Sequence, residues 1–189
     1  METVRHKVGT GGLLMVNPCD AKEKADQVLR LLKSTVESLG CDLVLLRGTC
    51  LGFVRDGDFI ENDNDIDVGI ISGSLECLGE EKEIVSERLL EAGFKCPNPV
   101  LLAGQEHWWA HNSDIMFCIR WIFEFPNAPG FSHLCFLKSF DEVTYNEETY
   151  NVPHPVEVYF GYFYRPELYG GVGWRTPHLR GWRKALKSP

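Results

Sequence analysis

The segment LRGTCLGFVRDGDFIENDNDIDV, residues 46–68, decides the fold. It begins at the end of the apolar run 42–46, which has the length and composition of a short strand. Gly48 and Thr49 follow, and a glycine there is typical of a turn between a strand and a helix. Such a turn lets backbone N–H groups approach an anion, and the positive end of the following helix favours phosphate. The pattern therefore predicts a strand, a phosphate-cradling turn and a helical turn.

Two aspartates stand at the other end of this segment. The run 65–71 (DIDVGII) alternates Asp65, Asp67 and Gly69 with Ile and Val, a period typical of a strand. We expect one face of this strand to be acidic and open, with Gly69 leaving room beside both carboxylates. Two carboxylates this close repel each other unless a cation lies between them, and oxygen ligands suit Mg²⁺ or Mn²⁺. Asp63 extends the row, and a solvated acidic edge strand without metal is the alternative.

Asp114 is the candidate for a third carboxylate of the same site. It is an isolated acid at the start of an apolar run that continues through residue 125. An acid at this position is costly unless it is exposed at the strand end, paired or metal-bound. We expect it to act as a third metal ligand or as a general base, and a strand-start residue in water is the alternative.

Periodicity also predicts the other elements. Helices are expected over 25–39 and 80–92 and from 155 onward, and strands over 100–103 and 134–140. The runs 142–145 and 149–152 predict a β-hairpin. Helices and strands alternate early and strands dominate later, which favours a mixed α/β (α+β) sheet with helices packed on it.

The decisive segment resembles the LicD/fukutin family, whose signature is roughly GTLLGAVR followed by FIPWDDDID. Here GTCLGFVR at 48–55 is followed by FI at 59–60 and DNDID at 63–67. The YG and WRTP motifs within 169–177 resemble the closing box of the family, so the likeness spans about residues 25–177. The resemblance implies the nucleotidyltransferase fold. The chain departs from the pattern at Asn64, which replaces an aspartate, and at 61–62, where Glu-Asn replaces Pro-Trp.

The resemblance implies a divalent-metal-dependent phosphotransferase with Mg²⁺ (or Mn²⁺) as its cofactor. Such an enzyme moves phosphocholine, a polyol phosphate or a similar group from a CDP-linked or other nucleotide donor to a sugar or glycan hydroxyl, as in cell-surface glycan modification. By this analogy the catalytic and metal-binding side chains are Asp65, Asp67 and Asp114, with Asp63 as a possible further ligand. The residues expected to bind donor phosphate or substrate are Gly48, Thr49, Arg55, Trp174 and Arg175.

Two other functions stay open at this point. A nucleotidylyltransferase of the same superfamily would leave NMP on a small-molecule or protein acceptor. A non-catalytic module of the same fold would bind a nucleotide or glycan without turnover. The retained pair Asp65 and Asp67 argues against the module, because a protein that only binds has little reason to keep two carboxylates opposite a glycine turn.

Composition limits the remaining possibilities. With 189 residues, 24% charged and 44% hydrophobic, the chain is neither disordered nor fibrous. We expect one domain over 1–189, with a core at about 20–177 and a basic tail at 178–189. The net charge of -8 argues against nucleic acid as a partner. No apolar run reaches the roughly 20 residues of a transmembrane segment, and no secretory signal is evident, so we expect a cytoplasmic protein.

Overall fold

The structure is a computed structural model that describes residues 18–61, 63–72, 78–96, 100–102, 105–122 and 134–164. The α-helices are α1 (Lys22–Ser38), α2 (Arg47–Asp56), α3 (Leu78–Glu91) and α4 (Val156–Tyr164). Short 3₁₀ helices are η1 (Pro18–Ala21) and η2 (Leu134–Leu137). The strands are β1 (Asp42–Leu45), β2 (Ile66–Ile71), β3 (Val100–Leu102), β4 (Gln105–His111), β5 (Met116–Ile122), β6 (Phe140–Tyr145) and β7 (Glu148–Pro153).

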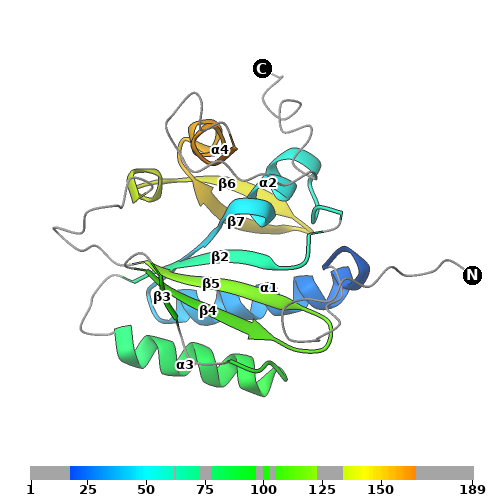
Figure 1. The fold of residues 1–189 in the computed structure, drawn as a ribbon, viewed down its shortest axis with the longest axis vertical. Helices are drawn as coiled ribbons and strands as arrows, with labels where there is room; N and C mark the ends of the chain where they lie inside the picture. The colour runs from blue at the N-terminus through cyan, green and yellow to red at the C-terminus, as the bar shows by residue number, and fades with distance from the viewer. Residues whose placement is uncertain are drawn as a thin grey trace, which may run out of the picture.

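The strands form one seven-stranded mixed sheet in the order β3-β4-β5-β2-β1-β7-β6. Strand β2 pairs in parallel with β5 and antiparallel with β1, and β1 pairs in parallel with β7. Helices α1 and α3 contact each other, whereas α2 and α4 lie together near β6 and β7 (Figure 1). The expected mixed α/β sheet with packed helices is therefore confirmed. None of the described helices is long and apolar enough to cross a membrane.

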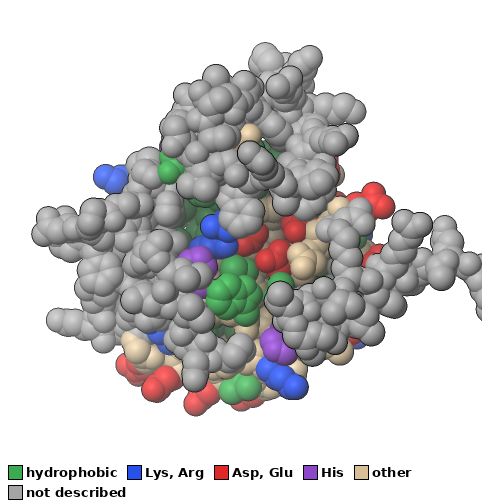
Figure 2. Space-filling model, viewed as in Figure 1, with side chains coloured by type: hydrophobic (Ala, Val, Ile, Leu, Met, Phe, Trp, Pro, Cys, Tyr) green, Lys and Arg blue, Asp and Glu red, His purple; other side chains and the backbone are tan. Residues whose placement is uncertain are grey.

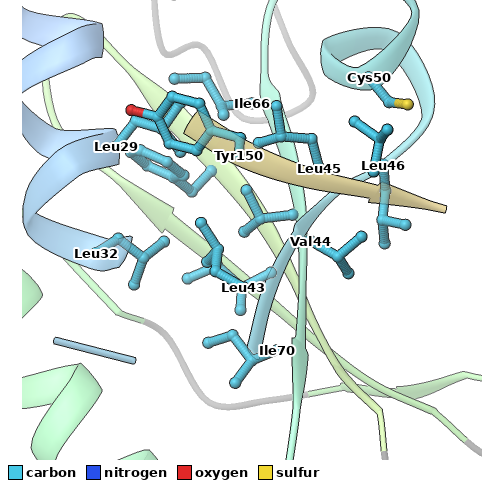
Figure 3. Close-up of a cluster of buried hydrophobic side chains, with 14 of the residues drawn as sticks. Leu29, Leu32, Leu43, Val44, Leu45, Leu46, Cys50, Ile66, Ile70 and Tyr150 are labelled. Atoms are coloured by element: carbon cyan, nitrogen blue, oxygen red, sulfur yellow. The ribbon is translucent and has the colours of Figure 1, made fainter. Parts of the chain in front are cut away.

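Burial on both faces of the sheet explains why the central strands are continuous apolar runs in the sequence. In β1, Leu43, Val44 and Leu45 are all buried, as expected of a strand covered on both faces. Figure 3 shows Leu32 of α1 near Leu43 and Leu29 of α1 near Tyr150, whereas Cys50 of α2 lies beside Leu46. Each fully buried leucine contributes roughly 1.5–3 kcal/mol through removal of its side chain from water. Helix α1 is thus fixed to the sheet by its apolar stripe.

Several expectations about the elements need correction. The hairpin is confirmed as β6 and β7. The strand expected over 134–140 is wrong, because residues 134–137 form the 3₁₀ helix η2 and β6 begins only at Phe140. The segment 105–111, for which no element is expected above, is strand β4.

The prediction of an open acidic face on β2 is wrong. Asp67 is only 7% exposed, and five of the six residues of β2 are buried. Gly69 does not leave room: a Cβ built there would lie 2.9 Å from side-chain atoms of Ile122 and Val44. Side chains of the neighbouring strands fill the space above this glycine. The carboxylate of Asp67 is consequently held in a largely closed environment.

Candidate functional site

The centre of the site joins β2 to its parallel neighbour β5. Asp67 lies opposite Cys118 in the register of the two strands, and Asp65 directly precedes β2. One carboxylate oxygen from each aspartate and the sulfur of Cys118 lie within 4.8 Å of one another. Sequence analysis placed the two carboxylates together, and the structure does so as well. The third potential ligand in this group is a thiol and not a carboxylate.

Thr49 fixes the start of α2 against β2. Its hydroxyl accepts a hydrogen bond from the backbone N–H of Asp67 at 2.8 Å, and the backbone N–H of Leu46 donates to the Asp67 carbonyl at 3.0 Å. Thr49 is 2% exposed, so this hydrogen bond is shielded from water. The threonine expected to bind phosphate therefore positions the backbone that carries a carboxylate.

Arg120 supplies a buried positive charge to the group. Its guanidinium donates to Asp67 Oδ1 at 2.9 Å and to the sulfur of Cys118 at 3.3 Å. Burial acts to lower the pKa of Arg120, but its interactions with Asp67, Cys118 and Tyr159 together outweigh burial, so the pKa is raised. Arg120 is 4% exposed, and its Nε has no hydrogen-bond partner among the described residues. The Asp67 carboxylate is thus oriented by a guanidinium that stays charged.

Arg47 brings a second positive charge at the first residue of α2. Its φ of 44° lies in the left-handed region, and its backbone N–H donates to the hydroxyl of Tyr159 on α4 at 2.9 Å. Burial and the charge of Arg120 lower the pKa of Arg47. Figure 2 shows acidic and basic side chains next to one another near the middle of the face that it displays. The helix N-terminus and Arg47 together favour an anion here.

The carboxyl groups of the site resist full ionisation in the absence of a cation. Burial and the negative charge of Asp67 raise the pKa of Asp63 to about 6. Burial and the charges of Asp67 and Asp63 raise the pKa of Asp65 to about 8. This crowding of like charges is what a bound cation would relieve.

Gly48 has a structural role of its own, separate from the expected phosphate cradle. A Cβ built at Gly48 would lie 2.1 Å from Oδ2 of Asp63, so only glycine permits this carboxylate to pack against α2. Gly48 is the second residue of the helix, not part of a turn before it. The glycine therefore contributes to the site by admitting Asp63.

Two further predicted residues lie apart from this group. Asp114, in the turn between β4 and β5, forms an ion pair with Lys24 of α1 at 2.5 Å, and hydrogen bonding to Lys24 lowers its pKa. Arg55 forms an ion pair with Asp56 at the C-terminal end of α2, about 12 Å along the helix from Arg47. The group of potential metal ligands, Asp65, Asp67 and Cys118, does not include Asp114. Trp174 and Arg175 lie outside the described residues.

The donor set fits a divalent cation. Asp65 and Asp67 offer carboxylate oxygens from one strand face. A bound cation would reduce the repulsion between their negative charges. Asp63 is close enough to influence both, although it is not a member of the group of atoms within 4.8 Å. The sulfur of Cys118 differs in kind, because thiolates prefer softer metals than Mg²⁺.

Sequence analysis missed three residues of the site. Cys118 and Arg120 alternate along the apolar run that follows Asp114, so period two places them on one face of a strand. That signal indicates a shared face, but only the parallel register with β2 brings them to Asp67. No sequence pattern marks Arg47 as a site residue, apart from its position directly before Gly48.

Comparison with solved structures finds proteins of similar fold. The chain is similar to the solution structure of the antibiotic-resistance factor ANT(2'')-Ia, with a TM-score of 0.58, 14% identity and coverage of 88% of this chain and 84% of that chain. A crystal structure of ANT(2'')-Ia in complex with adenylyl-2''-tobramycin gives a TM-score of 0.55, 12% identity and coverage of 85% and 86%. These likenesses concern the fold. No curated protein matches the chain.

The family model described as LicD/FKTN/FKRP, nucleotidyltransferase domain, matches residues 40–153. This range runs from the residues before β1 to the end of β7 and contains Asp65, Asp67, Cys118 and Arg120. More than half of the sequence is covered, including the strands that carry the site. The chain therefore belongs to the LicD/FKTN/FKRP family of nucleotidyltransferase domains.

Proposed function

We propose that this protein is a divalent-metal-dependent transferase that moves a phosphorus-containing group from a nucleotide donor to a hydroxyl acceptor. The observation that carries the proposal is the convergence of Asp65 and Asp67 beside the N-terminus of α2. Family membership supports a transferase, and the crowded carboxyl groups support a cation at this point. The finer proposal is a CDP-linked donor carrying phosphocholine or a polyol phosphate, and a sugar or glycan acceptor.

Asp65 and Asp67 would hold the ion, which we propose to be Mg²⁺ or Mn²⁺. A bound divalent ion offsets the charge that develops on phosphoryl oxygens and on the leaving nucleotide. Arg120 keeps one oxygen of Asp67 in a fixed hydrogen bond and so limits the orientations of that carboxylate. Catalysis would then depend on positioning and electrostatic stabilisation, without a covalent intermediate on the protein.

We assign contact with the donor phosphates to Arg47 and the first N–H groups of α2. Arg47 lies at the positive end of the helix and is electrostatically coupled to Asp67. A guanidinium can bind a phosphate through two parallel hydrogen bonds. Arg55 is less suited to this role, because its guanidinium is bonded to Asp56 at the opposite end of α2. Asp114 is paired with Lys24, so we assign it no contact with the metal.

Nucleotidyl transfer is the second candidate. The ANT(2'')-Ia crystal structure contains adenylyl-2''-tobramycin, a nucleotide joined to an aminoglycoside. A fold shared with that protein makes the transfer of NMP to a small-molecule hydroxyl chemically reasonable here. The two candidates differ in which part of the donor is transferred to the acceptor. Group transfer moves the phosphorylated head group, whereas nucleotidyl transfer moves the nucleoside monophosphate.

Mass spectrometry of the acceptor separates the two reactions. The purified protein is incubated with Mg²⁺ or Mn²⁺, a panel of nucleotide and CDP-linked donors, and sugar or glycan acceptors. Group transfer adds the mass of phosphocholine or a polyol phosphate and releases CMP, whereas nucleotidyl transfer adds the mass of the NMP. Asp67→Asn should abolish either product, and Glu87→Gln, an exposed acid on α3, should leave it unchanged. A product that forms equally with Asp67→Asn would refute the proposed site.

A further inference from the structure

The group of potential ligands contains an unexpected sulfur. Cys118 occupies the position on β5 directly opposite Asp67 on β2, and its side chain is 4% exposed. Its sulfur lies within 4.8 Å of carboxylate oxygens from both aspartates. The thiol therefore faces the site of the proposed ion and is shielded from solvent.

We propose that Cys118 is a third metal ligand that makes this centre favour thiophilic divalent ions, of which Zn²⁺ and Co²⁺ are the test cases. This inference rests on the proposed metal site at Asp65 and Asp67. Mg²⁺ takes oxygen ligands and gains nothing from sulfur. Zn²⁺ and Co²⁺ bind carboxylate and thiolate together in compact four-ligand sites, so they gain one strong ligand that Mg²⁺ does not.

A buried guanidinium holds the sulfur beside the Asp67 carboxylate. Arg120 donates to Cys118 at 3.3 Å and to Asp67 at 2.9 Å, so one guanidinium touches two of the three proposed ligands. When a divalent ion binds, it displaces the proton of the buried thiol and the proton that Asp65 retains at neutral pH; both protons leave to solvent and a sulfur–metal bond forms. The ion and Arg120 then balance the charge of two carboxylates and one thiolate. No buried charge is left uncompensated within the group, which is the condition for a stable buried site.

The test uses Co²⁺ as a spectroscopic probe on the full chain. Co²⁺ bound to a thiolate gives a sulfur-to-metal charge-transfer band in the near ultraviolet, which is independent of any catalytic activity. The wild-type protein should show this band, and Cys118→Ser should lack it. Cys41→Ser serves as the matched control, because Cys41 is also buried but lies directly before β1 and outside the ligand group. The control should keep the band.

Competition experiments measure the selectivity directly. Cys118→Ser should lower the affinity for Zn²⁺ at least about tenfold, since loss even of outer-shell partners costs 10–100-fold. Its affinity for Mn²⁺ should stay within about twofold of wild type, because the two carboxylates remain. Should Cys118→Ser fail to fold, Cys118→Ala takes its place, and loss of the wild-type band in Asp67→Asn gives a second measure.

Equal Zn²⁺ affinity in wild type and Cys118→Ser, or a Co²⁺ spectrum without the band in wild type, would overturn the assignment of Cys118. Failure of this inference is distinct from failure of the proposed function. Transfer supported by Mg²⁺ together with no thiolate band would retain the function and remove Cys118 as a ligand. A thiolate band that depends on Cys118, with no transfer to any acceptor, would retain the metal site and remove the enzyme activity.

Discussion

Thr49 shows how one hydroxyl determines the position of a site carboxylate. It accepts the backbone N–H of Asp67 at 2.8 Å in a buried environment. Thr49→Val leaves this donor unpaired and should lower the free energy of unfolding by about 1–3 kcal/mol. Thr49→Ser keeps the hydroxyl and loses one methyl group, which costs about 1 kcal/mol. Urea unfolding of both variants measures the difference, and equal losses would show that the hydrogen bond contributes nothing.

The raised carboxyl pKa values predict how pH affects stability without metal. The pKa is about 6 for Asp63 and about 8 for Asp65 in the folded protein, whereas unfolded aspartates titrate near pH 4. The folded state thus binds more protons than the unfolded state between about pH 4 and 8, so the free energy of unfolding falls as pH rises through this window. The Tm measured in EDTA should decrease from about pH 5 to pH 8. Asp65→Asn should flatten this decrease, and an unchanged slope would contradict the assignment.

At this residue scale the sequence predicted part of the site. Asp65 and Asp67 could be placed together because residues two apart in a strand share a face. Cys118 and Arg120 could not be paired with them, because a strand register depends on the turns and the packing of the whole sheet. The contact between Gly48 and Asp63 likewise depends on how the chain returns after α2.

Among the elements, helix α2 packs so closely against the following backbone at Gly52 that no side chain fits there. A Cβ at Gly52 would lie 2.5 Å from the backbone oxygen of Asp58, whereas a Cβ at Gly79 in α3 would meet nothing within 4 Å. Gly52→Ala should therefore destabilise the protein by about 1–3 kcal/mol despite better helix propensity. Gly79→Ala should stabilise it by roughly 0.5–1 kcal/mol. Thermal unfolding tests both, and an increase of Tm in Gly52→Ala would contradict the structure.

Elements with a strong period or a clear turn were the predictable ones. The helix α1 has an apolar stripe, and the hairpin of β6 and β7 has two alternating runs around a short turn. The segment of η2 is as apolar as a strand, but it forms a 3₁₀ helix that packs Phe136 against Tyr159 of α4. Short apolar runs do not distinguish strand from helix by composition, so tertiary packing determined this segment.

On the scale of the whole molecule, the sheet brings together charged residues that are far apart in sequence. Residues 56–81 contain acids but no Lys or Arg, and the site receives its positive charges from Arg47 and Arg120, which lie outside this segment. The net charge of -8 therefore includes a local excess of carboxylates at the site. A divalent ion that binds there should stabilise the folded state, by about 2.7 kcal/mol at a hundredfold excess over its Kd. Thermal unfolding with and without Mn²⁺ measures this, and Asp67→Asn should show no gain.

The most direct test of the central claim is the Mg²⁺-dependent transfer rate of Asp67→Asn relative to wild type. The metal is proposed to supply several kcal/mol of transition-state stabilisation, so the variant should be at least about 100-fold slower. Removal of Mg²⁺ from the wild type should cause a loss of similar size, and Glu87→Gln should retain full activity. A folded Asp67→Asn that transfers at the wild-type rate would contradict the account.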